Sequence, residues 1–435
     1  MSGKTKNTDA KAAAKRGLVP KLRFPGFRGA DAWTLEAGNS LFDQINDRTP
    51  EPGLPVLAIT QEHGAIPRHL IDYHVSVSEK SIESYKVVRV GDFIISLRSF
   101  QGGIEYSRHQ GICSPAYVIL RRRGEGSDEY FRHYLKTDRF IRILTRNLEG
   151  LRDGKMISYK QFSELMLPVP KLAEQQKIAD CLNSVDELMA AQARKVDALK
   201  THKKGLMQQL FPREGETQPR FRFPEFQNAR EWQEKPLSEF ILTLDAGVSV
   251  NSGDDRPAIK AELGVLKTSA ITKGQFDPEE NKVVLAESEL SRLREPVTGG
   301  TIIICRKNTP ALVGANAYVE STHENLFLPD LLWAAKPREG VSMRFLSCIL
   351  GSNIGRAALS KLAKGSSASM SNITKPEVLA FSVMAPSPAE QQRIASCLSI
   401  LDALIAAETQ KLEALKTHKK GLMQRLFPSA EAVEA

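Results

Sequence analysis

Hydrophobic positions recur with a heptad period in two long stretches of the chain. Apolar residues there alternate four and three positions apart, which is the seam pattern of a coiled-coil helix. The seam residues that we assign to such a helix pair are Ile178, Leu182, Val185, Leu199, Leu206, Ile394, Leu398, Leu401, Leu415 and Leu422. Polar residues interrupt the two seams at matching places, Gln192 and Glu408, then Lys203 and Lys419. Isolated polar seam residues fix the register and the partner of a coiled coil.

The ends of both helices can be located in the sequence. Ser387 can act as the N-cap of the second helix, Pro388 fits its first position, and Glu390 completes a capping box. Pro212 and Pro428 end the two helices. A helix from Glu174 to Leu210 is ~55 Å long at 1.5 Å per residue. Because a whole domain separates the helices in sequence, we predict an antiparallel pair; two separate surface helices, each packed on its own domain, are the alternative.

The two halves of the chain begin alike and end alike. The run AEQQKIADCL from Ala173 recurs with two changes from Ala389, and LKTHKKGLMQ from Leu199 recurs unchanged from Leu415, at an offset of 216 residues. A shorter repeat, PKLRFPGF from Pro20, resembles a run that begins 199 residues later. The sequences between these repeats differ. This arrangement indicates a common scaffold that carries two variable domains; plain duplication followed by drift is the alternative.

Both variable stretches show mixed strand and helix patterns. The predicted strands are Val56–Thr60, Val87–Val90, Phe93–Leu97, Ala116–Leu120, Gly264–Thr268, Val283–Leu285, Thr301–Cys305 and Ala317–Val319, with a turn at Gly91-Asp92. The predicted helices are Asp128–Asn147, Ser342–Leu350 and Ile354–Leu362. The fold class is therefore α+β, with two mixed α/β domains in tandem pseudo-repeat, each followed by a long helix. The domain boundaries are a disordered basic tail at 1–18, domains at 19–171 and 213–387, helical regions at 172–212 and 388–428, and a tail at 429–435.

In each half, a predicted strand runs directly into a polar loop. Arginine pairs bidentately with guanine, asparagine or glutamine pairs with adenine, and small polar residues let the backbone approach phosphates. A second polar loop, 150–155 or 364–369, precedes each return to the scaffold. The candidate DNA-binding residues are Arg98, Ser99, Gln101, Arg108, Arg152, Lys155, Lys267, Thr268, Arg306, Lys307, Asn308, Ser366 and Ser367. For each residue, a solvated surface loop is the alternative interpretation.

Composition and charge narrow the function classes. The net charge is +9, and residues 1–171 hold most of it, with 27 Lys and Arg against 19 Asp and Glu. Such a surface suits a polyanion, because neutralised phosphates release counterions. Five scattered cysteines without a CxxC pair indicate a reduced, cytoplasmic protein without a zinc site. We find no membrane span, secretory signal, GxGxxG, Walker A loop, HExxH or GxSxG. We predict no catalytic residues and no bound metal.

Taken together, these features resemble the specificity (S) subunits of Type I restriction–modification systems, the HsdS family. The resemblance covers residues from about 20 to 428 and rests on the repeat. It includes the run PKLAEQQ from Pro170, its second copy PSPAEQQ from Pro386, and the signature-like GDFIIS from Gly91. In the second half, that signature reads GGTIII from Gly299 and lacks the aspartate, which makes this match weaker.

The resemblance implies a non-catalytic, sequence-specific DNA-binding subunit. Each recognition domain would read one half of a bipartite target in double-stranded DNA, and the helix pair would act as a ruler for the gap. Two methyltransferase (M) subunits and restriction/translocase (R) subunits would be its partners. S-adenosylmethionine, ATP and magnesium would bind those partners, and this chain would need no cofactor. The alternatives are a DNA-reading subunit of another defence methyltransferase assembly and a coiled-coil adaptor that binds no DNA.

Overall fold

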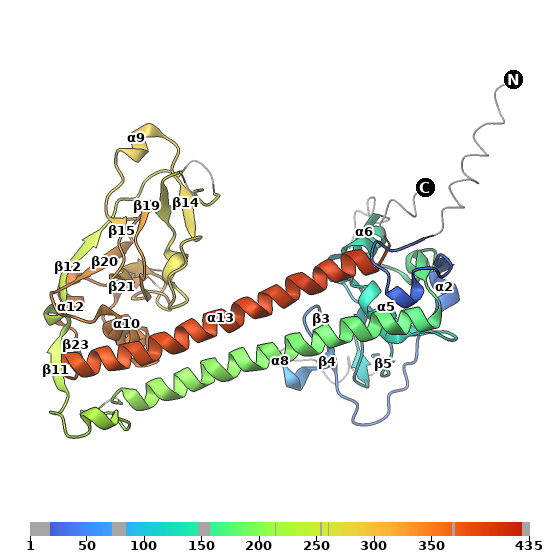
Figure 1. The fold of residues 1–435 in the computed structure, drawn as a ribbon, viewed down its shortest axis with the longest axis horizontal. Helices are drawn as coiled ribbons and strands as arrows, with labels where there is room; N and C mark the ends of the chain where they lie inside the picture. The colour runs from blue at the N-terminus through green and yellow to red at the C-terminus, as the bar shows by residue number, and fades with distance from the viewer. Residues whose placement is uncertain are drawn as a thin grey trace. The chain divides into compact units, whose positions relative to one another are not determined.

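The chain forms two compact units in a computed structural model. The structure describes residues 18–71, 84–146, 157–213, 215–252, 255–259, 261–367 and 370–428. One unit comprises Met1–Arg194 with Thr409–Ala435, and the other comprises Lys195–Glu408. Each unit therefore contains one α/β domain and a part of each of two long helices, α8 (Leu172–Leu210) and α13 (Pro388–Leu426), drawn in green and red in Figure 1.

The first unit is built on a four-stranded antiparallel sheet in the order β2-β9-β6-β7. Its strands are β1 (Thr34–Ala37), β2 (Phe42–Ile45), β3 (Leu57–Thr60), β4 (Gly64–Pro67), β5 (Lys86–Val88), β6 (Phe93–Ile95), β7 (Glu105–Tyr106), β8 (Gly111–Cys113), β9 (Val118–Arg122) and β10 (Met166–Val169). Its short helices are α2 (Gly38–Leu41), α4 (Ser99–Gly102), α5 (Asp128–Tyr134), α6 (Asp138–Arg146) and α7 (Tyr159–Ser163).

The second unit repeats this sheet as β12-β20-β16-β18. Its strands are β11 (Gln233–Pro236), β12 (Ile241–Ala246), β13 (Gly264–Leu266), β14 (Asn281–Val283), β15 (Pro296–Val297), β16 (Ile302–Cys305), β17 (Lys307–Asn308), β18 (Asn316–Tyr318), β19 (His323–Phe327), β20 (Leu332–Pro337), β21 (Lys364–Ser367), β22 (Met370–Asn372) and β23 (Ser382–Ala385). Its short helices are α9 (Glu287–Leu290), α10 (Met343–Gly351), α11 (Asn353–Lys361) and α12 (Lys375–Ala380). A second sheet, β14-β13-β19-β15, includes the parallel pair β13–β19.

In both units, the strand that opens the domain pairs with the strand that precedes the long helix. The pairs β1–β10 and β11–β23 are antiparallel. Each domain therefore closes at the base of its helix. The core of the first unit includes Ile178 and Leu182 of α8 together with Leu426 of α13. The core of the second unit includes Leu210 of α8 and Ile394 of α13.

The two long helices pair in an antiparallel direction within each unit. In the first unit, Asp186 of α8 binds Lys419 of α13. In the second unit, Lys203 of α8 binds Asp402 of α13, and Lys195 binds Glu408. Residue numbers fall along α13 as they rise along α8, which defines an antiparallel pair. The predicted fold class and the helix pairing are confirmed. Glu390 N lies 3.4 Å from Ser387 Oγ, in agreement with the predicted cap.

The predicted seam residues differ in how far their side chains are buried. Ile178, Leu182, Val185, Ile394 and Leu398 are buried. Leu206 and Leu422 are half-buried against the cores of their units, and Leu199, Leu401 and Leu415 are half-buried as well. The polar seam residues Lys203 and Lys419 each meet an aspartate of the opposite helix. The interruptions in the seams thus coincide with ion pairs between helices.

Two sequence predictions need correction, and the predicted strands differ in detail. The eight predicted strands correspond to β3, β5, β6, β9, β13, β14, β16 and β18, with ends displaced by no more than two residues. The predicted helix Asp128–Asn147 is wrong as one element, because it divides into α5 and α6. Thr137 causes the break, since its Oγ1 donates to Tyr134 O and accepts from Phe140 N. The predicted loop at 364–369 is also wrong, because Lys364–Ser367 forms strand β21 and pairs with β22.

Candidate nucleic-acid interface

A buried ion pair joins the start of the first domain to the start of helix α8. Arg23 donates from Nε to Glu174 Oε1 at 2.8 Å and from Nη2 to Glu174 Oε2 at 2.7 Å. The remaining guanidinium hydrogens reach Ala30 O and Asp31 O, each at 2.8 Å. This bidentate hydrogen bonding to Glu174 raises the pKa of Arg23. The pair fixes where the domain meets its helix.

The second unit contains the same ion pair. Arg222 binds Glu390 at 2.8 and 2.7 Å, and it also donates to Ala229 O and Arg230 O. Trp232 adds a hydrogen bond from Nε1 to Glu390 Oε1 at 3.3 Å. Both copies of the short repeat in the sequence therefore help to hold an α/β domain against the helix that follows it.

The glutamine after each buried glutamate turns back to the preceding segment. Gln175 Nε2 donates to Pro170 O at 2.8 Å, and Gln391 Nε2 donates to Pro386 O at 3.0 Å. Gln175 Oε1 also accepts from Ser127 N at 2.9 Å. The buried Glu and Gln side chains of the repeated run thus join the domain to the helix and are not available to DNA.

A third matched contact joins each domain to the end of a long helix. In the first unit, Leu22 N donates to Arg425 O of α13 at 2.8 Å. In the second unit, Phe221 N donates to Gln209 O of α8 at 3.0 Å. Each α/β domain is therefore joined to the start of one long helix and to the end of the other.

A triad of charged residues also joins each domain to the two long helices. In the first unit, Asp186 accepts from Arg132 Nη2 at 3.2 Å and from Lys419 Nζ at 2.5 Å. In the second unit, Asp402 accepts from Arg344 Nη2 at 3.0 Å and from Lys203 Nζ at 2.5 Å. One arginine comes from the domain, the aspartate from the helix that follows it, and the lysine from the other helix. Each triad therefore connects three elements.

His133 is a buried titratable neighbour of the first triad. Its Nε2 lies 2.9 Å from Asn183 Oδ1 and 3.0 Å from Arg132 Nη2. Burial, and then the nearby Arg132 charge, lower its pKa from 6.5 to about 3. The buried Phe345 follows Arg344 at the matching place in the second unit. Only the first attachment therefore contains a buried titratable ring at this place.

We expect the first unit to lose stability as the pH falls from 7 to 5. The unfolded His133 takes up a proton near pH 6.5 while the folded ring stays neutral down to about pH 3. The native state then binds fewer protons, which costs about 2 kcal/mol at pH 5. His133→Phe should remove this loss, measured by hydrogen exchange of the buried β6 amides at both pH values. His69→Phe, at an exposed position, is the control. An unchanged pH dependence in His133→Phe would contradict the assignment.

The signature-like Gly91-Asp92 run serves the central sheet. Gly91 has a φ of 96° at the turn, a conformation that favours glycine. Asp92 is fully buried and accepts from Arg121 Nε on β9 at 2.7 Å and from Arg89 N at 2.7 Å. In the second unit, Thr301 stands in place of the aspartate, and its hydroxyl donates to Thr298 O at 2.7 Å. Both versions close the turn before the central strand.

The predicted DNA-binding residues of the first half lie at the end of β6 and beyond. Arg98 and Gln101 are exposed at α4. Ser99 is buried, and its Oγ accepts from Ser96 N at 2.9 Å, so its hydroxyl serves the turn. Arg108 is exposed and lies 3.3 Å from Glu129. Arg152 and Lys155 lie outside the described residues.

In the second half, the fold unites two predicted groups that are far apart in sequence. Strand β17 contains Lys307 and Asn308 and pairs with β22, which pairs in turn with β21, where Ser366 and Ser367 lie. The result is a three-stranded sheet, β17-β22-β21. Lys307 is exposed and Asn308 is half-buried. Both groups therefore belong to one local sheet.

Lys267 and Thr268 lie at the end of β13 and are half-buried. Lys267 Nζ lies 4.0 Å from the exposed carboxylate of Asp255. Their strand belongs to the sheet β14-β13-β19-β15, which is separate from the sheet β17-β22-β21. No hydrogen bond or ion pair between the described residues joins these two residues to Arg306, Lys307 or Asn308.

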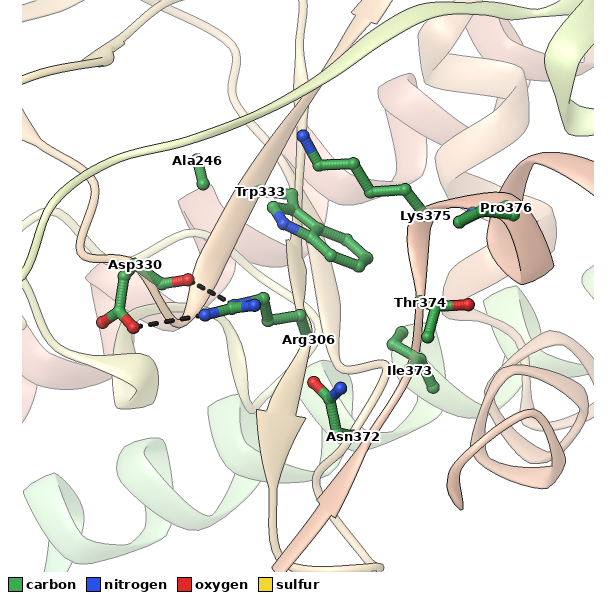
Figure 2. A pocket seen from close by; sticks show the side chains of 9 residues that line it. All are labelled: Ala246, Arg306, Asp330, Trp333, Asn372, Ile373, Thr374, Lys375 and Pro376. Atoms are coloured by element: carbon green, nitrogen blue, oxygen red, sulfur yellow. Dashed lines mark hydrogen bonds and ion pairs between the residues drawn. The ribbon is translucent and has the colours of Figure 1, made fainter. Parts of the chain in front are cut away.

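A pocket of about 410 Å³ borders β22, and Figure 2 shows the residues that line it. Arg306 lies in this pocket and donates from Nε to Asp330 O at 2.5 Å and from Nη2 to Asp330 Oδ2 at 3.2 Å. Lys375 Nζ lies 6.0 Å from the ring centre of Trp333. The amide oxygen of Asn372 is covered and has no hydrogen-bond partner among the described residues. Sequence reasoning missed Trp333, Asn372 and Lys375, because they come from three separate elements.

A larger groove, of about 1330 Å³, lies within the first unit. The hairpin β3–β4, the loop after β7, helices α5 and α6, and the first-unit parts of α8 and α13 line it. Ten Lys and Arg side chains line it against four Asp and Glu side chains. Six of these ten positive side chains belong to residues 1–171 and three to the C-terminal part of α13, so both segments contribute to the positive charge of the groove.

The described residues contain no group of side chains typical of a metal site. No cluster of three or more His, Cys, Asp and Glu residues that could hold a metal ion occurs among them. Cys113, Cys305 and Cys348 are buried, and burial raises the pKa of the Cys113 thiol to about 12. This thiol therefore stays protonated and is a poor nucleophile. No helix in the described part of the chain has both the length and the apolar composition needed to cross a membrane.

The comparisons with known proteins agree with this architecture. The family described as the Type I restriction modification DNA specificity domain matches the chain twice, over residues 36–201 and 256–417. The MjaVIII specificity subunit of a Type I restriction enzyme from Methanocaldococcus jannaschii is 25% identical over 364 residues, with 81% of each chain covered. The solved S subunit of a Type I restriction–modification system from M. genitalium has a TM-score of 0.55 at 16% identity, with 95% of this chain and 100% of that chain covered.

A further solved chain comes from work on complex assembly and conformational transition of the type I R-M system. It has a TM-score of 0.50 at 17% identity and covers 91% of this chain and 98% of its own length. These two likenesses show a shared fold. The family matches span more than half of the chain, and therefore this chain belongs to the Type I restriction–modification DNA specificity family. Its members named above are specificity subunits, which supports the predicted non-catalytic role.

Proposed function

We propose that this chain reads a split DNA target, with one recognition domain for each half-site. The observation that carries the proposal is the double family match, one match in each half of the chain. The two halves also contain central sheets of corresponding strand order, β2-β9-β6-β7 and β12-β20-β16-β18. The same scaffold thus presents two different sets of polar side chains. Two different sets of DNA-contacting side chains on one scaffold suit an asymmetric, bipartite DNA target.

We assign the recognition domains to residues 19–171 and 213–387, and the helical regions to residues 172–212 and 388–428. Residues 1–18 and 429–435 are assigned as tails. The attachment contacts support these divisions, since Arg23 and Arg222 bind the first turns of the helices that follow their domains. A domain defined in this way carries its own central sheet and its own ion pair to the scaffold.

The exposed members of the predicted set are the proposed DNA contacts. These are Arg98, Gln101 and Arg108 in the first domain and Lys307 in the second, joined by the partly buried Arg306, Asn308, Lys267 and Thr268. Arg152, Lys155, Ser366 and Ser367 remain in the proposal on sequence grounds. Ser99 is left out, because it is buried and its hydroxyl completes a turn. Arginine and asparagine supply base contacts, and lysine supplies phosphate contacts.

The paired helices set the gap between half-sites in this proposal. Helix α8 has 39 residues, which corresponds to ~58 Å at 1.5 Å per residue. That length equals roughly 17 base pairs at 3.4 Å each. Polar seam residues that pair across the helices fix the register, and a fixed register is what a ruler requires.

The partners in this proposal are double-stranded DNA, two methyltransferase subunits and restriction/translocase subunits, in the cytoplasm. A two-fold repeat in the scaffold offers two equivalent docking places, which favours two methyltransferase copies. Those partners would bind S-adenosylmethionine, ATP and magnesium. This chain would supply the DNA sequence specificity and would catalyse no reaction itself.

A domain exchange tests the two-reader model. Residues 20–171 are replaced by the first recognition domain of a relative with a different target, and the methylated motif is mapped genome-wide. We expect the new motif to carry one changed half-site, while the other half-site and the gap stay as they were. A motif in which both half-sites change would overturn the model. The reciprocal exchange of residues 219–387 is the matched control and should change only the other half-site.

A further inference from the structure

The basic groove of the first unit contains two kinds of positive side chains. The inner ones are committed to carboxylates: Arg132 and Lys419 bind Asp186, and Lys136 binds Glu105. Burial raises the pKa of Glu105 and lowers the pKa of Lys136, which agrees with an ion pair removed from water. The Asp186 contacts join the domain to both long helices, and the Lys136–Glu105 pair lies within the domain.

The outer positive side chains are exposed and only weakly paired. Lys416 is about half exposed and lies 2.8 Å from Glu413, three residues earlier on the same helix. Lys420 is 67% exposed and lies 3.7 Å from Asp138 of α6. Surface ion pairs of this kind contribute only ~0–1 kcal/mol. Both lysines can therefore give up these contacts to a stronger anion, and both stand one turn apart on the same face of α13.

The internal repeat adds an independent argument about these lysines. The run Leu415–Gln424 is identical to Leu199–Gln208. Packing in the seam accounts for positions such as Leu415, but not for the exposed Lys416 and Lys420 or their counterparts Lys200 and Lys204. Exposed residues that are identical in both halves fit a binding partner that is the same at both half-sites. Base sequence differs between half-sites, whereas the phosphate backbone does not.

We propose that Lys416 and Lys420 of helix α13 bind DNA phosphates beside the first half-site, so that the scaffold helix itself contributes to DNA affinity. The proposal rests on the proposed DNA-reading function and adds a contact that lies outside the recognition domains. The excess of positive charge in the groove favours a polyanion over a protein surface. Contacts of this kind add affinity and orient the duplex but carry no sequence preference.

The test uses the full-length chain, co-purified with its methyltransferase partner, and the double variant Lys416→Ala/Lys420→Ala. Alanine keeps the helix intact, because it has the highest helix propensity. Dissociation constants are measured across a salt series for a duplex that holds the mapped target and for one of equal length with both half-sites scrambled. The matched control is Lys160→Ala/Lys411→Ala, which removes two exposed lysines outside the groove. Lys416→Arg/Lys420→Arg retains both charges.

We expect the slope of log Kd against log salt to fall by about 1.8 for both duplexes, at about 0.9 per lost phosphate contact. If the contribution of these two phosphate contacts to affinity vanishes near 1 M salt, the Kd of the double variant at 0.15 M salt is roughly 30-fold higher than that of the parent chain. The preference for the target over the scrambled duplex should stay the same, and the arginine variant and the control should behave like the parent chain.

Two outcomes would overturn the inference. One is an unchanged salt slope, and the other is a loss of methyltransferase co-purification at unchanged DNA affinity, which would assign this surface to a protein partner. Failure of the underlying function is distinguishable, because the parent chain itself would then show no preference for the target duplex.

Discussion

Replacing Glu390 with alanine is expected to destabilise the second unit by ~3–5 kcal/mol, the cost of removing one partner from a buried ion pair. The Glu390 side chain is 1% exposed and the Arg222 side chain is 13% exposed. The variant leaves the Arg222 guanidinium and the Trp232 ring nitrogen without their acceptor. Thermal unfolding followed by calorimetry should show the second unit melting roughly 10 °C lower.

Glu225→Ala is the matched control, because Glu225 and Arg393 join the same two segments of the second unit by an exposed ion pair. Their side chains are 47% and 46% exposed. We expect this control to melt close to the parent chain, since surface pairs contribute little. If Glu390→Ala and Glu225→Ala were equally mild, the buried pair would not be the structural anchor that we assign.

Lengthening both long helices is expected to widen the gap in the DNA target without changing either half-site. Seven residues inserted after Ala190 in α8 and seven after Ala414 in α13 keep both seams in phase. The added ~10.5 Å corresponds to about 3 base pairs. Binding to the original target should weaken by at least about 100-fold, because one half-site is then out of place. Methylation mapping of cells that carry the variant reads the new gap directly.

The same insertion in α8 alone is the control. It would put either the Asp186–Lys419 pair or the Lys203–Asp402 pair out of register, because α13 keeps its length. We expect this variant to be unstable and to methylate poorly. If the paired insertion changed the bases of a half-site and left the gap unchanged, the helices would not act as a ruler.

The long helices were predictable because their information is local and repeated. A seam of apolar residues every three or four positions, a proline at each end and a serine cap define a helix without reference to the rest of the fold. Two strands of each central sheet, β6 and β9 in the first and β16 and β18 in the second, were also placed to within two residues, because β-branched runs mark buried strands. The other four strands of these sheets were not predicted. The break between α5 and α6 was missed, since one threonine side chain decides it.

The candidate interface was less accessible to sequence reasoning. The polar runs after β6 and β16 could be singled out because each follows a strong strand pattern, although the first forms the short helix α4 and the second contains β17. The pairing of β17 with β22 was not foreseen, because the partners lie more than sixty residues apart and loop sequences carry no mark of their partner. Lys416 and Lys420 lie within the predicted helical region 388–428 and were not singled out, because a lysine on a helix has the same sequence pattern whether it faces solvent or a groove.

The sequence by itself determined the repeat, the two long helices and the family, since each depends on patterns within one segment. Only the tertiary structure decided what the repeated residues do. Arg23 and Glu174 are 151 positions apart and meet as a buried ion pair, and Asp186 and Lys419 are 233 positions apart and meet across the helices. Such contacts depend on the tertiary fold, because two residues far apart in sequence become neighbours only in the folded chain. An ion pair is also removed from water only there, and its energy depends on that burial.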